Sequence, residues 1–101
     1  IYKIQAYLLE NLQTKFIGID ALSTMFRDSP TTLKHDIKNV LGQSIFSYFQ
    51  SKQIELAKVI LLEGNRSIAE IASAFEYNNP SKFSKTFKKI TGFLPSEFSK
   101  N

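Results

Sequence analysis

The sequence predicts an all-α fold of about seven helices, in which two helix-turn-helix subdomains are joined by a long linker helix. Three observations carry this prediction. Helix-capping residues and helix-ending glycines recur along the chain, no segment sustains the apolar–polar alternation of a strand, and one pattern of apolar and turn residues occurs twice. The length of 101 residues suits one domain, or two very small ones that share a helix.

In the first half of the chain, an amphipathic segment and two glycines mark the helices. The segment at 2–13 opens the chain. Ser29-Pro30 places a capping side chain directly before a proline at the first helical position. Gly42 and Gly64 each follow an apolar periodic run, as residues that end helices do. The helices expected here are 2–13, 19–26, 30–41 and 45–63.

The second half carries the same kinds of signal. Ser67-Ile-Ala-Glu70 has the spacing of a capping box, in which each side chain satisfies a backbone amide of the other residue. Asn79-Pro80 repeats the cap-and-proline pattern, and Gly92 follows the next apolar run. Leu94-Pro95 opens a last short helix. The helices expected here are 68–75, 80–91 and 95–100.

A short helix, a turn and a second helix form a motif that occurs at 19–42 and again at 68–92. Its first helix matches at an offset of 49, and its second helix at an offset of 50, because the second turn has one extra residue. The matched pairs are Ile19 and Ile68, Leu22 and Ile71, Phe26 and Phe75, Pro30 and Pro80, Leu33 and Phe83, Ile37 and Phe87, Lys38 and Lys88, and Gly42 and Gly92.

This motif has the order of a helix-turn-helix, whose second helix can lie in the DNA major groove. In each second helix an apolar stripe faces inward, and we expect it to comprise Leu33, Ile37, Val40 and Leu41, and Phe83, Phe87 and Ile90. The outward faces are rich in hydrogen-bond donors, which suit phosphate oxygens and base-edge acceptors. Their residues are Thr31, Thr32, Lys34, His35 and Lys38, and Ser81, Lys82, Lys85, Lys88 and Lys89.

Charge supports an anionic partner. The net charge is +4, and residues 51–101 carry eight Lys and Arg against five Asp and Glu, a net of +3. Residues 78–92 contain four lysines and no acid. The linker adds a geometric argument, because a helix of about nineteen residues spans roughly 28 Å, and successive major grooves on one side of B-DNA lie about 34 Å apart.

Composition argues against several other classes of protein. The chain has no Cys and a single His, so it offers neither a disulfide framework nor a zinc site. Its longest purely apolar run, 59–62, is far too short to span a membrane, and no signal peptide opens the chain, so we expect a cytoplasmic location. No phosphate-binding glycine loop or paired acids suggest an enzyme, and no cofactor is expected.

Two segments resemble the DNA-binding domain of the AraC/XylS family of bacterial transcription regulators. "IAEIASAFEYNNPSKFSKTFKKITGFLPSEF" (68–98) is similar to the family's signature around the second helix-turn-helix, and "GQSIFSYFQSKQIELAKVILLEG" (42–64) resembles the start of its linker helix. The resemblance covers the chain from about residue 4 to the end. It implies a first helix-turn-helix subdomain at 1–44, a linker at 45–63 and a second subdomain at 64–101.

The resemblance also implies contacts with double-stranded promoter or operator DNA. Base contacts are expected from Thr31, Lys34, His35, Pro80, Ser81 and Lys85. Backbone contacts are expected from Thr32, Lys38, Asn79, Lys82, Lys88 and Lys89. RNA polymerase and a sensing or dimerisation domain outside this fragment are further expected partners.

Three residues depart from the family pattern. The family usually has Gly in the second turn where this chain has Glu76, often has Arg where it has Gln53, and often has an aromatic residue where it has Lys82. If the turn needs positive φ, Glu76 costs about 1 kcal/mol. An alternative reading from a different class is a helical protein-interaction module with non-specific DNA affinity, since helix-turn-helix units also serve as docking domains.

Overall fold

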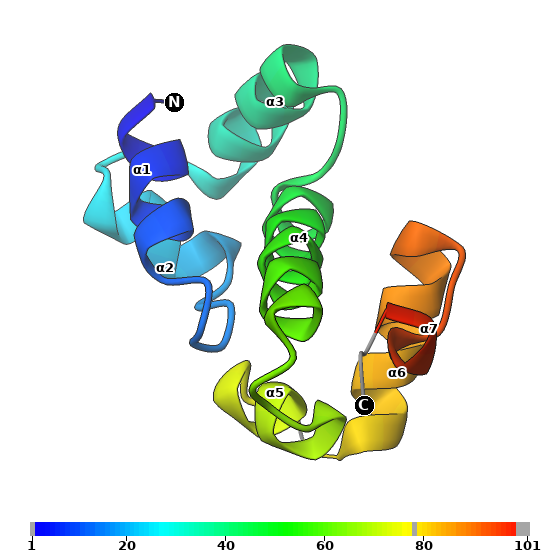
Figure 1. The fold of residues 1–101 in the computed structure, drawn as a ribbon. Coiled ribbons are helices and arrows are strands. Elements are labelled where there is room, and N and C mark those ends of the chain that lie inside the picture. The colour runs from blue at the N-terminus through cyan, green and yellow to red at the C-terminus, as the bar shows by residue number, and fades with distance from the viewer. Residues whose placement is uncertain (1, 78, 99–101) are drawn as a thin grey trace. The chain divides into compact units, whose positions relative to one another are not determined.

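The computed structural model describes residues 2–77 and 79–98, which form seven α-helices and no strand. The prediction of an all-α fold is thereby confirmed. The helices are α1 (Tyr2–Glu10), α2 (Ile19–Met25), α3 (Pro30–Leu41), α4 (Ile45–Glu63), α5 (Ile68–Ala74), α6 (Pro80–Thr91) and α7 (Pro95–Phe98), as Figure 1 shows. Among the helices that the structure describes, none combines the length and the apolar character needed to cross a lipid bilayer.

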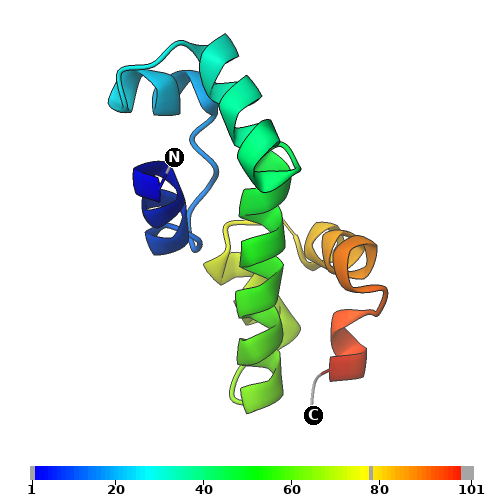
Figure 2. The ribbon, with the colours of Figure 1, turned by 90° about the horizontal axis from the view of Figure 1, so that it is seen from above.

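The chain divides into two compact units, Ile1–Gln50 and Ser51–Asn101, called the first and second unit below. The boundary falls within α4, a continuous helix that belongs to both units and is seen along its length in Figure 2. The core of the first unit is aliphatic apart from two residues of α4, and α2 packs directly on α3. The core residues are Ile4, Leu8, Leu22, Leu33, Ile37, Ile45, Tyr48 and Phe49.

The second unit buries more aromatic surface. Phe83 and Phe87 of α6 are fully buried, with ring centroids 5.8 Å apart. Tyr77 meets Phe83 edge-on at 5.5 Å, and Phe98 of α7 meets Phe87 edge-on at 5.5 Å. This chain of rings joins the turn, α6 and α7, and edge-on geometry is the favoured arrangement for such pairs.

The two turns of the repeat begin with the same backbone geometry. Arg27 follows α2 with φ 57°, and Glu76 follows α5 with φ 59°. In the first turn, the amide of Asp28 donates to the carbonyl of Ser23 at 2.8 Å, and in the second, the amide of Tyr77 donates to Ala72 at 3.0 Å. These six-residue bonds belong to a Schellman-type helix ending, which requires a left-handed residue. The structure therefore supports the match at an offset of 49.

Two expectations about helix α1 and the inward stripes were wrong. Helix α1 ends at Glu10 rather than 13, because the side-chain amide of Asn11 donates to the carbonyl of Tyr7 at 2.7 Å and competes with the backbone ladder. Val40 and Ile90 are 59% and 37% exposed, so neither belongs to the core. Both lie one turn beyond the last buried residue, at equivalent positions of the repeat. Residues 99–100 of the last predicted helix lie outside the described residues.

Candidate nucleic-acid interface

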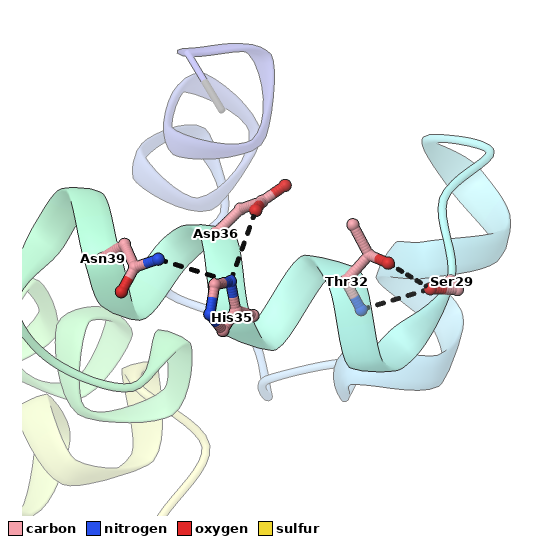
Figure 3. Close-up of polar contacts among 5 residues, drawn as sticks. All are labelled: Ser29, Thr32, His35, Asp36 and Asn39. Carbon is pink, nitrogen blue, oxygen red and sulfur yellow. Dashed lines mark hydrogen bonds and ion pairs between the residues drawn. The ribbon is translucent and has the colours of Figure 1, made fainter.

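Helix α3 begins at a polar cap that fixes its first turn. The Ser29 hydroxyl oxygen accepts a hydrogen bond from the Thr32 amide at 3.1 Å and donates to the Thr32 hydroxyl at 2.8 Å, as Figure 3 shows. The Ser29 amide in turn donates to Asp28 Oδ1 at 2.9 Å. Pro30 occupies the first helical position, where its missing N–H costs nothing. Cap and proline together hold the N-terminus of α3 in one geometry.

Helix α6 is built in the same way from different residues. Asn79 Oδ1 accepts from the Lys82 amide at 2.9 Å, and Pro80 takes the first helical position. Each of the two helices has twelve residues and ends at a left-handed glycine. The Gly42 amide donates to the backbone carbonyl of Lys38, and the Gly92 amide donates to the backbone carbonyl of Lys88, both at 2.8 Å. The predicted caps and stops of α3 and α6 are confirmed.

The outward face of α3 carries donors one helical turn apart. Thr31, Lys34, His35 and Lys38 are exposed, at spacings of three, four and seven residues that put them on one side of a helix. Leu33 and Ile37 lie buried on the other side. The face is thus presented by side chains that take no part in the core.

His35 on this face has two polar neighbours. Its Nδ1 lies 3.3 Å from the Asn39 side-chain amide nitrogen and 3.8 Å from Asp36 Oδ1 (Figure 3). In the neutral tautomer in which Nδ1 accepts from Asn39, Nε2–H is the donor that remains for a ligand. The imidazole side chain is 73% exposed, which leaves that edge accessible.

The outward face of α6 is more basic. Ser81, Lys85 and Lys88 share one side of the helix, flanked by Lys82 and Lys89, and all are exposed. No acidic residue lies within the helix, whereas α3 contains Asp36. The buried side is held by two phenylalanines with no exposed surface. This face suits an anionic ligand better than any other helix face of the second unit.

All twelve predicted contact residues are exposed and lie on α3, α6 or their caps. The structure gathers five of them on the first unit and seven on the second. The sequence-based prediction did not include Ser84, which is the counterpart of Lys34 at the repeat offset of 50. Ser84 is half-buried on the edge of the α6 face. The alignment of the two repeats pairs Ser84 with a predicted contact residue and could therefore have identified it.

One carboxyl group at the start of α5 has a shifted pKa. The Ser67 amide donates to Glu70 Oε1 at 2.9 Å, and the Glu70 amide donates to the Ser67 hydroxyl at 3.1 Å, which confirms the predicted capping box. The backbone hydrogen bond from Ser67, followed by the side-chain bond, lowers the pKa of the Glu70 carboxyl. Glu70 therefore stays ionised at the start of α5.

Comparison with known proteins decides the family. Residues 22–101 match a family model described as "Helix-turn-helix domain". The chain belongs to this family, in its AraC/XylS branch. This AraC/XylS-type domain is 31% identical over 98 residues to the F1 operon positive regulatory protein of Yersinia pestis, a match that covers 97% of the chain and 33% of that protein.

Two further similarities agree. The AraC/XylS-type domain is 30% identical to the arabinose operon regulatory protein of Salmonella typhimurium, over 91% of the chain and 33% of that regulator. Its fold superimposes on the C-terminal domain of AraT, a response regulator from Geobacillus stearothermophilus, with a TM-score of 0.89 and 26% identity, covering 96% of this chain and 80% of that one. The chain spans about a third of the length of these curated relatives.

Proposed function

We propose that this chain binds double-stranded DNA sequence-specifically in the regulation of transcription, with α3 and α6 lying in successive major grooves. The observation that carries the proposal is the pair of equivalent outward faces. Each is presented by a twelve-residue helix with a polar cap, a proline at its first position and a left-handed glycine at its end. A rigid helix with donors on its exposed side is the form in which helix-turn-helix proteins read bases.

Base reading is assigned to the side chains nearest the N-terminal half of each face. Lysine and histidine donors recognise acceptors such as guanine O6 and N7, and hydroxyl groups accept or donate at either base. Pro80 has no side-chain donor and contributes only apolar contact, for instance with a thymine methyl group. The assigned residues are Thr31, Lys34, His35, Pro80, Ser81 and Lys85.

Phosphate binding is assigned to the residues on the flanks and at the caps. Lysines on the flanks neutralise phosphates without reading sequence, and the first amides of each helix add partial positive charge. Asn79 uses its Oδ1 for the cap, which leaves its NH₂ group to donate to a phosphate oxygen. The assigned residues are Thr32, Lys38, Asn79, Lys82, Lys88 and Lys89.

The division of labour follows the repeat. We assign residues 1–44 and 64–101 to two reading subdomains and 45–63 to the linker between them. Helix α4 has nineteen residues and hence a length of roughly 28 Å, which is of the order of the roughly 34 Å between successive grooves. One chain then reads what a dimeric repressor reads with two.

Other partners follow from the length of the relatives. The chain spans about a third of regulators whose names describe control of operons. We infer that a sensing or dimerisation domain lies outside these residues, that RNA polymerase is a partner at the promoter, and that the protein acts in the bacterial cytoplasm, where the DNA is. The proposal gives the chain no catalytic step and no cofactor.

Selection of bound duplexes from a randomised pool of about 25 base pairs, at near-physiological salt, tests the proposal. Two enriched blocks about 10 base pairs apart are expected if both faces read bases from one side of the duplex. One block alone would overturn base reading by one subdomain. Absence of enrichment at every salt concentration would overturn specific reading by this chain.

The alternative function, a helical protein-interaction module, differs in its salt dependence. DNA binding through phosphates gives a log affinity that falls linearly with log salt, with a slope close to the number of neutralised phosphates. Docking through an apolar groove depends weakly on salt. The basic face of α6, with four lysines and no acid, favours the DNA reading over this alternative.

A further inference from the structure

A cavity of about 360 Å³ opens beside α3, the proposed recognition helix of the first unit. Four of its lining side chains are apolar, and two lysines and a serine complete the lining. The lining residues are Phe16, Ile19, Lys34, Lys38, Ser44, Ile45 and Phe46. All belong to the first unit. The volume is within the range of small-molecule sites, about 300–1,000 Å³.

The aromatic wall of this cavity is not a general property of the motif. The Phe16 ring meets the Phe46 ring edge-on at 5.4 Å and the Phe49 ring at 5.4 Å. At the repeat offsets of 49 and 50, the counterparts of Phe16 and Phe46 are Asn65 and Ser96. The second unit has the same helix-turn-helix framework without rings at these two positions, so the aromatic wall is specific to the first unit, where Phe16 also packs against the core.

Phe46 packs against Phe16 with only part of its ring. It is the second residue of α4 and is 47% exposed, although its neighbours Ile45 and Phe49 are buried in the core. An exposed aromatic side chain over a cavity costs solvation that a bound apolar group would recover. The position therefore indicates a ligand with an apolar body.

The lysines supply the charge that such a ligand must match. Lys34 and Lys38 are one helical turn apart on the flank of α3 that borders the cavity. Within the described part of the chain, neither side chain forms an ion pair. No carboxylate lines the cavity. Two ammonium groups above an apolar wall match one anionic head on an apolar body.

We propose that this cavity binds a small amphipathic organic anion, with its apolar body against Phe16 and Phe46 and its anionic group between Lys34 and Lys38. The same two lysines belong to the face that is assigned to DNA. A bound anion neutralises them and occupies the flank of α3, so ligand and DNA exclude each other. This competition rests on the proposed function, whereas the binding site does not.

Titration of the labelled chain with 1-naphthalenesulfonate, followed by amide chemical shifts, tests the site. The expected result is saturable shifts at Lys34, Lys38 and Ile45, with weaker binding of the neutral 1-naphthalenesulfonamide. Phe46→Ala should weaken the sulfonate by about tenfold, since it removes the ring contact, and Phe46→Leu should weaken it less. Val59→Ala, an equally exposed apolar position elsewhere on α4, serves as the matched control and should have no effect.

Equal binding of sulfonate and sulfonamide, shifts confined to other residues, or unchanged affinity in Phe46→Ala would each overturn the site. Amide spectra of the variants show directly that each remains folded. Competition is tested with the best duplex from the selection, for which saturating sulfonate should weaken DNA binding. If the sulfonate binds and the affinity for DNA stays the same, competition is wrong and the site stands. If no duplex binds, the DNA proposal has failed while the shifts still report on the site.

Discussion

The turn between α2 and α3 of the first unit contains Arg27. The equivalent turn between α5 and α6 of the second unit contains Glu76. Both turns begin with the same backbone geometry, with φ near 60° and matching hydrogen bonds. The side chains differ in sign, at a place that immediately precedes a proposed recognition helix. The turn therefore tolerates either charge structurally, and we expect the choice of charge to affect DNA binding rather than the fold.

The cores and the first-helix caps differ as well. Leu33 and Ile37 of the first unit correspond to Phe83 and Phe87, which pack in a chain of rings. Helix α2 follows Gly18, which makes no side-chain cap, whereas α5 has a complete capping box. The second unit thus has the ring contacts and the complete cap, and the cavity with the Phe16 and Phe46 wall lies in the first. The comparison teaches that one framework is compatible with different cores and different ligand-facing residues.

The largest effect is expected in the aromatic core. Phe83→Ala should lower the free energy of unfolding by about 3–5 kcal/mol, because it opens a cavity among buried rings. Phe83→Leu introduces the residue of the first unit and should cost clearly less. Urea denaturation followed by circular dichroism measures both. Equal losses would mean that the stabilisation comes from ring contacts that leucine cannot replace, and not from apolar volume.

The next effect concerns DNA affinity. Lys85→Ala should cost about 1–3 kcal/mol of binding and relax preference at one base position. Lys88→Ala should weaken all duplexes alike and reduce the salt slope by about one. Binding isotherms on the selected duplex and on single-base variants, at several salt concentrations, separate the two roles. An unchanged preference in Lys85→Ala would contradict base reading at that residue.

A smaller effect is expected in the turns. Glu76→Gly should stabilise the chain by about 1 kcal/mol, because a left-handed conformation strains any residue with a Cβ, and it should raise DNA affinity by removing a negative charge. Arg27→Gly relieves the same strain and should lower DNA affinity. Thermal unfolding and binding isotherms of the pair distinguish strain from charge. Affinity changes of the same sign would show that the turn charges do not sense the ligand.

The smallest effect is a pH dependence. The folded pKa of Glu70 is lowered below its usual value of 4.5 by the Ser67 hydrogen bonds. The capping box therefore stabilises the fold fully above pH 4.5, and its contribution is lost as the pH falls through the lower folded pKa. Glu70→Gln should remove this part of the dependence. Unfolding free energies measured between about pH 6 and pH 3 test it, and identical slopes in the two proteins would contradict it.

Helix boundaries were predictable from the sequence because their signals are local. Ser29-Pro30, Asn79-Pro80 and the glycines specify ends through residues within one turn, and α3, α4 and α6 begin and end where expected. The end of α1 was missed because Asn11 is also compatible with a helix interior, and only its side-chain bond to Tyr7 shows otherwise. The spacing of apolar residues alone does not show which residue of an apolar stripe is the last to be buried.

The cavity was not predictable from sequence, because Phe16 and Phe46 are thirty residues apart and both lie outside the repeated segments 19–42 and 68–92. The exposed donor faces could be predicted, since periodicity separates Leu33 and Ile37 from the outward side of α3. Which donor contacts which base depends on how the DNA duplex is positioned on the protein. That position is not encoded in the chain alone. The base and phosphate roles therefore stay predictions.

The cap of α3 also sets the direction of the hydrogen bond between the hydroxyl groups of Ser29 and Thr32. The Ser29 oxygen accepts from the Thr32 amide, so its proton goes to the Thr32 oxygen. The proton of the Thr32 hydroxyl then remains for an acceptor outside the cap, at the end of a polarised chain in which each bond strengthens the next. A phosphate oxygen can only accept. If DNA binds as we propose, the cap thus supplies a donor for a phosphate oxygen, and α6, with Lys82 at this position, does the same with a full charge.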